Sequence, residues 1–363
     1  MKKGTMVFRF SRKFAAVTAL VGAAALMTSC SGGPSEGSAS ADFVYAASGG
    51  YTEEYEQQLG KTLFAGYTSD TGGEITVTKG DCGINTLAQE VAAGNVTASI
   101  YVFCSTAEKQ QAIEQGLLQK IDRDVVPTDL VQDDHVDDYG IDFASWTMGL
   151  AYDGAVYPNH PTSIGDFFDT EKFPGKRCVS NFPMYSGLFE AALVHDGVAP
   201  KDIYPFDFDR VYAQLDRIKS DILFFSNTAE GGQNLLTGQC GMMLNGAGDT
   251  KIMADQNPER DIRFVQEDGV GAYAAIGIPK GAPNPEAANK YLKSIIENRK
   301  GLAEMLVSKA GYAVMLKDQL PVPDELSDWA GVLTSDDFFP MDERWYLDNI
   351  GTILERWNVW IVS

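Results

Sequence analysis

The sequence predicts an α/β fold, and three observations support this. Short runs rich in β-branched and apolar residues alternate along the chain with segments of helical periodicity. The run at residues 98–103 is apolar throughout, as expected for a strand buried on both faces of a parallel sheet. Beyond the first forty or so residues, roughly 320 remain, which is enough for a large core and for more than one lobe.

The first part of this pattern predicts strands at residues 42–46, 74–79 and 98–103. Asn85 is placed to cap a helix that Gly94 ends, between the second and third strands. A further helix follows Cys104, Ser105 and Thr106 and ends at Gly116.

A second unit begins near residues 149–153 and continues with a strand at 176–180. Ser186 and Asp209 are the expected caps of two helices that follow. Further strands are expected at residues 241–244, 262–266 and 272–278. Asn284 and Pro285 mark the start of a helix, and the last helix is expected near residues 343–361.

The amino terminus has the pattern of an export signal. Five basic residues lie among the first thirteen, and an uncharged apolar run at residues 14–27 follows, too short and wrongly flanked for a spanning helix. Residues 26–30 resemble a bacterial lipobox, which implies a signal peptide at 1–29 and a lipid on Cys30. The alternative is ordinary secretion with Cys30 unmodified. Residues 30–41 would then form a lipid-anchored flexible tether that holds the protein on the membrane surface.

The chain is strongly acidic, with a formal net charge of −21. Removing the five basic residues of the leader would make it about −26. Nucleic acid is therefore not an expected partner, because phosphate binding needs a basic face. The acidity is expected either to serve solubility or to attract cations to the surface.

Four cysteines remain besides Cys30, and an even number in an oxidising compartment indicates disulfides. Of the three possible pairings, the order of the residues favours Cys82 with Cys104 and Cys178 with Cys240. A metal site is not expected, because no two cysteines have C-x-x-C spacing and the three histidines are scattered. No cofactor is expected either.

The sequence carries no recognisable catalytic motif. A G-x-S-x-G match at residues 33–37 lies in the expected tether, away from any strand, and no P-loop, H-E-x-x-H or dinucleotide-binding motif is present. Instead, small polar residues follow several predicted strands and open helices. Ligands bind at this edge of open α/β sheets, so a binding cleft is expected.

Several segments, in order, resemble the polyamine-binding branch of the bacterial ABC-importer solute-binding proteins. They are Tyr45-Ala-Ala-Ser-Gly-Gly-Tyr51, Ser163-Ile-Gly-Asp-Phe-Phe168, Phe173-Pro-Gly-Lys-Arg177, Glu190-Ala-Ala-Leu-Val-His-Asp-Gly-Val198, Ile203-Tyr-Pro-Phe-Asp-Phe-Asp-Arg210, Met243-Leu-Asn-Gly246, Gly311-Tyr312 and Glu355-Arg-Trp-Asn-Val-Trp360. Together they extend over nearly the whole chain beyond the tether.

The resemblance implies a periplasmic-binding-protein-like fold of type II, with two lobes that close on a solute like a hinge. Residues 42–149 with 273–314 would form lobe 1, and residues 150–272 with 315–363 lobe 2. The two crossing strands would lie near 149–153 and 272–278. The implied protein is a monomeric receptor rather than an enzyme. It would act on the extracellular face of the cytoplasmic membrane, or in the periplasm, and deliver its solute to an ABC permease.

The resemblance also implies a set of ligand-binding positions. These are Ser48, Gly49, Gly50, Tyr51, Ser105, Thr106, Tyr185, Ser186, Asn245, Tyr273 and Tyr312. The carboxylates that grip polyamines in that branch align with Met184, Gly187 and Ala274, so Asp249 or Glu190 would have to replace them. The solute is thus either a polyamine or a small carboxylate, phosphonate or amino-acid-like molecule. An extracellular α/β hydrolase and an adhesin-like surface protein are the alternative classes.

Overall fold

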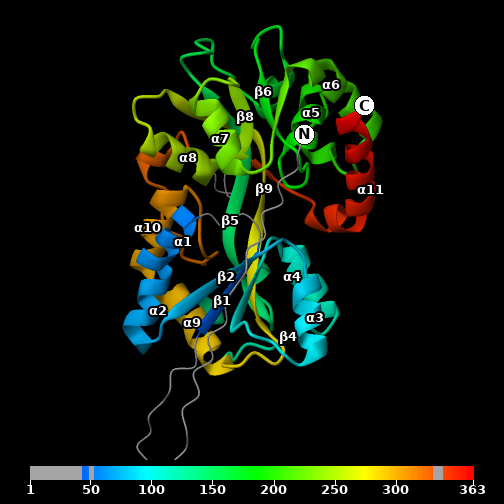
Figure 1. Cartoon of the computed structure of the whole chain (residues 1–363). Coiled ribbons are helices and arrows are strands. Elements are labelled where there is room, and N and C mark those ends of the chain that lie inside the picture. The colour runs from blue at the N-terminus through cyan, green and yellow to red at the C-terminus, as the bar shows by residue number, and fades with distance from the viewer. Residues whose placement is uncertain (1–42, 49–52, 330–337) are drawn as a thin grey trace, which may run out of the picture. The chain divides into compact units, whose positions relative to one another are not determined.

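The structure is a computed structural model that describes residues 43–48, 53–329 and 338–363. Two α/β lobes, each with its own hydrophobic core, are joined by the two long strands β5 (Gly140–Asp153) and β9 (Ile262–Pro279) (Figure 1). Both lobes belong to one compact unit, Ser40–Ser363. The two-lobed fold with two crossing strands, expected from the sequence, is therefore confirmed.

In the described residues, lobe 1 contains the amino-terminal strands and six α-helices. Its strands are β1 (Phe43–Ser48), β2 (Ile75–Gly80), β3 (Ile100–Phe103) and β4 (Leu118–Gln119). Its helices are α1 (Glu53–Lys61), α2 (Leu63–Thr71), α3 (Asn85–Ala93), α4 (Thr106–Glu114), α9 (Pro285–Glu297) and α10 (Arg299–Lys309).

The lobe 1 sheet is covered on both faces. β1 pairs in parallel with β2 on one side and with β3 on the other, so the carboxyl ends of the three strands lie at one edge. Successive side chains of a strand point to opposite faces. Accordingly, Ile100 packs into the cluster that contains α2 and α9, and Tyr101 packs into the cluster that contains α3.

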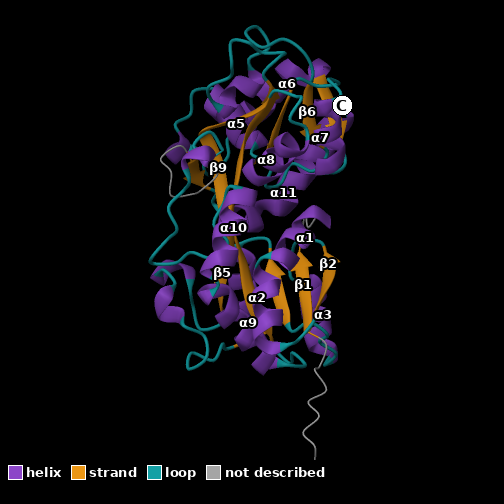
Figure 2. Cartoon of the chain, turned by 90° about the vertical axis from the view of Figure 1, so that its left-hand side faces the viewer, coloured by secondary structure: helices purple, strands orange, loops and turns teal. Residues whose placement is uncertain are grey.

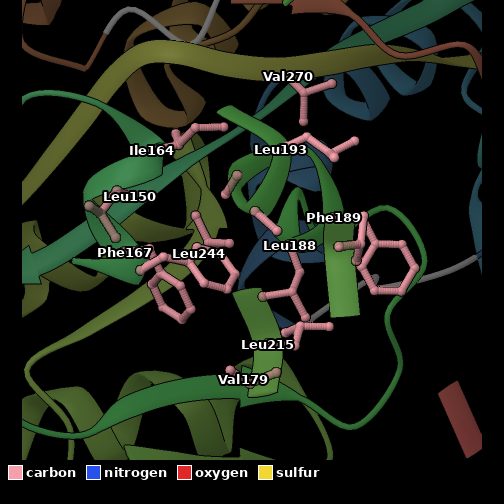
Figure 3. Close-up of a cluster of buried hydrophobic side chains, with 14 of the residues drawn as sticks. Leu150, Ile164, Phe167, Val179, Leu188, Phe189, Leu193, Leu215, Leu244 and Val270 are labelled. Atoms are coloured by element: carbon pink, nitrogen blue, oxygen red, sulfur yellow. The ribbon is translucent and has the colours of Figure 1, made fainter. Parts of the chain in front are cut away.

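Lobe 2 contains β6 (Arg177–Ser180), β7 (Ile222–Phe225) and β8 (Met242–Gly246). Its helices are α5 (Leu188–His195), α6 (Phe208–Ile218), α7 (Thr228–Leu236), α8 (Ala247–Gln256) and α11 (Glu343–Val362). Side chains from β5, β6, β8, α5 and α6 converge in the main core of this lobe, as Figure 3 shows.

β5 and β9 run antiparallel to each other and take part in both lobes. Both strands extend through the two lobes (Figure 2). In lobe 1 β9 pairs with β3, and in lobe 2 β5 pairs with β8. β5 is paired with β8 from Met148 onward, one residue before the expected crossing at 149–153. The short strand β10 (Phe338–Pro340) pairs with the middle of β9.

Several local predictions are corrected by the structure. The two strands expected at residues 262–266 and 272–278 are one continuous strand, in which Asp268 has a positive φ of 61°. Asp207 rather than Asp209 caps α6, and Asn85 is the first residue of α3 rather than its cap. The helix start at Asn284 and Pro285 and the helix end at Gly94 are confirmed.

Both expected disulfides are present. Cys82 is bonded to Cys104, and Cys178 to Cys240, with Cα–Cα distances of 5.6 Å in each case. Within the described ranges, no helix combines the length and apolarity needed to cross a membrane. Cys30 and the rest of the expected anchor lie outside the described residues.

Candidate functional site

A cavity of about 450 Å³ lies between the lobes, and residues of both line it. Lobe 1 contributes Ser48 at the end of β1, Cys104 just after β3, and the end of α10. Lobe 2 contributes Tyr185 in the segment after β6 and Asn245 at the end of β8. The carboxyl ends of parallel strands from both lobes therefore meet at this cavity, which is where α/β sheets bind ligands. Its volume is typical of small-molecule sites, which measure roughly 300–1,000 Å³.

The cavity wall carries one positive and one negative side chain. Lys309 Nζ, at the end of α10, lies 2.9 Å from Asp249 Oδ1 in the first turn of α8. Lys309 Nζ also lies 4.8 Å from the centre of the Tyr55 ring. Among the described residues that line the cavity, these two are the only charged ones. The pair joins the two lobes and leaves the wall with no net charge.

The amino terminus of α8 also borders the cavity. Gly246, Ala247 and Gly248 are lining residues, and Gly246 at the cap position has no side chain to accept the helix N–H groups. Asn245 donates to Thr250 Oγ1 at 2.9 Å, which fixes its amide against the same helix. A helix amino terminus carries partial positive charge and free N–H groups. Together with Lys309, it offers a favourable position for an anionic group.

Aromatic side chains form another part of the wall. Trp146 on β5 and Tyr185 pack edge to face, with ring centroids 6.0 Å apart. Tyr185 has a positive φ of 56°, which costs energy for a non-glycine residue and often marks functional sites. Burial raises the pKa of its hydroxyl well above the usual value, opposed in part by a contact with the Ser105 hydroxyl. Tyrosine and tryptophan rings of this kind suit an apolar chain or an ammonium group.

The two lobes approach closely at one edge of the cavity, where α8 meets α10 (Figures 1 and 2). A Cβ atom on Gly248 would lie 2.5 Å from the carbonyl oxygen of Lys309, closer than real Cβ contacts. Only glycine fits at this position without moving one lobe away from the other. The Lys309–Asp249 ion pair lies at the same junction.

A second, more open depression lies on the other side of the crossing strands. Its centre is Glu343, the first residue of α11, which accepts hydrogen bonds from the amides of Ala107 at 3.0 Å and Tyr273 at 3.2 Å. Burial, opposed in part by these bonds and reinforced by Asp142, raises the pKa of Glu343 to about 7. The carboxylate thus connects α11 of lobe 2 to α4 of lobe 1 and to β9.

Asp142 on β5 is the other buried acid of this depression, at 2% exposure. It accepts a hydrogen bond from Thr106 Oγ1 at 3.0 Å, and its Oδ2 lies 2.7 Å from His135 Nδ1. Lys109 Nζ lies 3.6 Å from Oδ1 of the same carboxylate. These contacts satisfy Asp142 internally, so they stabilise the crossing region of lobe 1.

The structure divides the predicted ligand positions between the two cavities. Ser48, Tyr185, Asn245 and Tyr312 line the first, whereas Thr106 and Tyr273 line the second. Two of the predicted serines line neither cavity. Ser105 is fully buried and caps α4, and the hydroxyl of Ser186 accepts the amide of Leu188. Gly49, Gly50 and Tyr51 lie outside the described residues.

The helix amino termini predicted to face the solute are used differently than expected. The amide of Glu108 in the first turn of α4 binds Ser105, and that of Ala107 binds Glu343, so internal acceptors occupy both. The uncapped end of α8, which the sequence reasoning did not single out, is the one that borders the first cavity.

Lys309, Trp146 and Tyr55 line the cavity but are not among the predicted positions, whereas Asp249 is one of the two acids considered as replacement carboxylates. Lys309 lies two positions before Gly311, which with Tyr312 is one of the segments that carry the family resemblance. Nothing in its local pattern separates it from other helical lysines. Glu190, the other acid considered, lies in the lobe 2 core and accepts hydrogen bonds from Tyr204 and Tyr346.

One group of potential metal ligands occurs among the described residues, namely Cys82, Cys104 and Glu108. The two cysteines are joined in a disulfide, so they offer no thiolate to a metal.

Comparisons with known proteins place this geometry in a family. The profile of the family described as bacterial extracellular solute-binding protein matches residues 62–333. A γ-aminobutyric acid-binding protein of Pseudomonas aeruginosa is 24% identical over 326 residues, which cover 86% of this chain and 88% of that protein.

Two solved structures have the same fold over most of the chain. A protein described as a GABA receptor is 25% identical with a TM-score of 0.74, over 88% of this chain and 98% of that one. The protein AgtB of A. tumefaciens R10, solved with agropinic acid, is 24% identical with a TM-score of 0.72, over 89% of this chain and 99% of that one. The chain belongs to the family of bacterial extracellular solute-binding proteins.

Proposed function

We propose that this protein is the receptor of an ABC importer and that it binds a small amino-acid-like zwitterion between its lobes. One observation carries the proposal, namely the pairing of Lys309 with Asp249 on the cavity wall. A solute with one carboxylate and one ammonium group can satisfy both side chains, because buried charges need opposite charges or hydrogen bonds. A γ-amino acid such as γ-aminobutyric acid, named for two of the relatives, has this chemistry.

The geometry suggests how such a solute would be oriented. Its carboxylate would lie against Lys309 and the uncapped amino terminus of α8, where the charge and the N–H groups favour an anion. Its methylene chain and ammonium group would lie against the rings of Trp146 and Tyr185, with Asp249 as the counter-charge. No covalent step is needed, and closure of the lobes would bury the solute for recognition by the permease.

A polyamine fits the described wall less well. It carries at least two ammonium groups, and one of them would have to approach the ammonium of Lys309 or displace it from Asp249. The aligned positions Met184 and Ala274 line the cavity but supply no carboxylate. The charge of the wall therefore supports the amino-acid-like alternative over the polyamine.

Four linear four-carbon compounds test the proposal by isothermal titration calorimetry and thermal shift. γ-Aminobutyric acid has both charged groups, putrescine only amines, butyrate only an acid, and succinate two acids. We expect binding and an increase in Tm with γ-aminobutyric acid alone, because each other compound leaves Asp249 or Lys309 without a counter-charge. Tighter binding of putrescine than of γ-aminobutyric acid would refute the zwitterion. Hydrolysis of an ester substrate without any binding in the panel would refute the receptor.

We also propose that the protein is a monomeric lipoprotein anchored through Cys30. The lipobox-like segment and the Gly/Ser-rich residues after it support this. Incorporation of labelled palmitate into the native protein, lost in C30A, is the expected result. A C30A protein that keeps the label would contradict the anchor, and light scattering of the soluble domain at twice the monomer mass would contradict the monomer.

A further inference from the structure

The Cys82–Cys104 disulfide lies at the solute cavity, unlike the other disulfide. Both of its cysteines are lining residues. Cys82 follows β2 and Cys104 follows β3, and these two strands flank β1 in the sheet. The bond therefore connects the two loops on either side of the carboxyl end of β1, where Ser48 borders the cavity.

The peptide groups of Cys104 connect this disulfide to an aromatic side chain of the cavity. The carbonyl of Cys104 accepts a hydrogen bond from the indole Nε1 of Trp146 at 3.4 Å. Trp146 in turn packs edge to face against Tyr185 of lobe 2. Cys104 is thus connected through one hydrogen bond to the indole ring of Trp146, which lines the cavity and contacts Tyr185 of the opposite lobe.

The loop that carries Cys104 is also held by a buried acid of α4. Glu108, 2% exposed, accepts the amide of Cys104 at 3.0 Å, and a hydrogen bond from the amide of Gly83 also stabilises its charged form. Tyr101 donates its hydroxyl to the carbonyl of Gly83 at 3.3 Å. These bonds hold each loop to the body of lobe 1 without the disulfide, so its loss should shift the two loops relative to each other but should not unfold the lobe.

We propose that the Cys82–Cys104 disulfide is a positioning element of the solute site, which sets the place of Trp146 in the cavity and thereby the affinity for solute. This inference rests on the proposed function for its affinity readout only. Its structural part, the dependence of Trp146 on the disulfide, stands independently of which solute binds.

The chain offers a matched control in the second disulfide. Cys178 and Cys240 are 1% and 2% exposed in the core of lobe 2, and neither lines the cavity. Their bond closes a loop of 62 residues against 22 for Cys82–Cys104, so its removal should cost at least as much stability. A change in affinity seen only with the first pair cannot then come from a general loss of stability.

The experiment compares C82S/C104S and C178S/C240S with the unmodified domain at 15 °C, where far-ultraviolet circular dichroism verifies folding. Affinity for γ-aminobutyric acid is measured by calorimetry, and the indole N–H resonance of Trp146 by NMR, assigned with W146F. We expect C82S/C104S to lose at least tenfold in affinity and to shift the Trp146 resonance. C178S/C240S should lower Tm, but its affinity for γ-aminobutyric acid should stay within twofold of the unmodified protein. Its Trp146 resonance should not shift.

The inference would be overturned if C82S/C104S kept the affinity and the Trp146 resonance of the unmodified protein. It would also be overturned if C178S/C240S lost affinity and shifted the resonance as much as C82S/C104S. If no solute in the panel binds the unmodified domain, the proposed solute fails, but the Trp146 resonance still decides the positioning role. If C82S/C104S does not fold, W146F replaces it, because it keeps the disulfide and removes the indole donor to Cys104 together with part of the ring that lines the cavity. An unchanged affinity in folded W146F would then refute the inference.

Discussion

Replacing Glu343 by Gln should flatten the pH dependence of stability between about pH 5 and pH 8. Glu343 is largely enclosed between α11, α4 and β9, and burial is the main cause that raises its pKa to about 7 from the ordinary 4.5. The folded protein therefore binds this proton more tightly than the unfolded chain. The neighbouring charge of Asp142 adds to the same effect.

The sign and size of the effect follow from linkage. Because the pKa is higher in the folded state, the contribution of this carboxyl to stability is fully present below about pH 4.5 and is lost as the pH rises through about 7. A difference of about 2.5 pKa units corresponds to about 3 kcal/mol in the free energy of unfolding at most. The amide of E343Q has one acceptor oxygen for two backbone donors, so the variant should also lose about 1 kcal/mol at every pH.

Urea unfolding at pH 5 and pH 8 measures this as a double difference. The free energy of unfolding should fall by about 2–3 kcal/mol more in the unmodified protein than in E343Q over this interval. Glu286 is a control, since it is exposed at the surface and paired with Lys290, so E286Q should change the slope little. An equal change in the free energy of unfolding from pH 5 to pH 8 in the unmodified protein and E343Q would refute this assignment. A free energy of unfolding that rises with pH in the unmodified protein but not in E343Q would refute it too.

Two further substitutions test the cavity between the lobes, one at Lys309 and one at Gly248. K309M should weaken binding of γ-aminobutyric acid by roughly 10–100-fold in calorimetry, since a charge-assisted hydrogen bond is lost. K300M, on the exposed face of α10, should leave the affinity unchanged. Equal losses of affinity in both variants would argue against a contact of Lys309 with the solute. G248A should weaken solute binding and increase the radius of gyration of the solute-loaded protein in X-ray scattering, because its Cβ would meet the Lys309 carbonyl. G60A, whose Cβ would meet nothing within 4 Å, is its control, and a compact, tight-binding G248A would contradict the proposed closure.

The sequence predicted most of the fold because its signals are local. The apolar run at Ile100–Phe103 and the Asn284 and Pro285 start of α9 specify a strand and a helix without reference to the rest of the chain. The sequence pattern predicts two separate strands for β9, at residues 262–266 and 272–278. In the structure the strand is continuous, but its pairing with β5 is interrupted at this segment. Met148 pairs with Val270 and Leu150 with Val265, so residues 266–269 form a bulge, and β10 pairs with β9 from Gly269 onward.

The cavity was predicted less completely, since its charged wall is assembled from distant parts of the chain. Lys309 and Asp249 are 60 residues apart, on helices of different lobes, and each is ordinary in its own helix. Four positions indicated by the family resemblance, Ser48, Tyr185, Asn245 and Tyr312, line the cavity, since they follow recognisable strands and loops. It could not indicate the charge of the solute, because that depends on which side chains face each other across the junction.

The neutrality of the described wall also bears on how the receptor could distinguish its solutes. A fixed ion pair between Lys309 and Asp249 means that a dication would enter a cavity with no net charge to compensate its own, and its desolvation would be only partly repaid. A zwitterion exchanges one internal ion pair for two with the solute, so charge is balanced before and after binding. Since each partner of that pair belongs to a different lobe, a solute that separates the two side chains replaces one connection between the lobes by another through itself. Affinity for the solute and closure of the lobes would then depend on the same two residues.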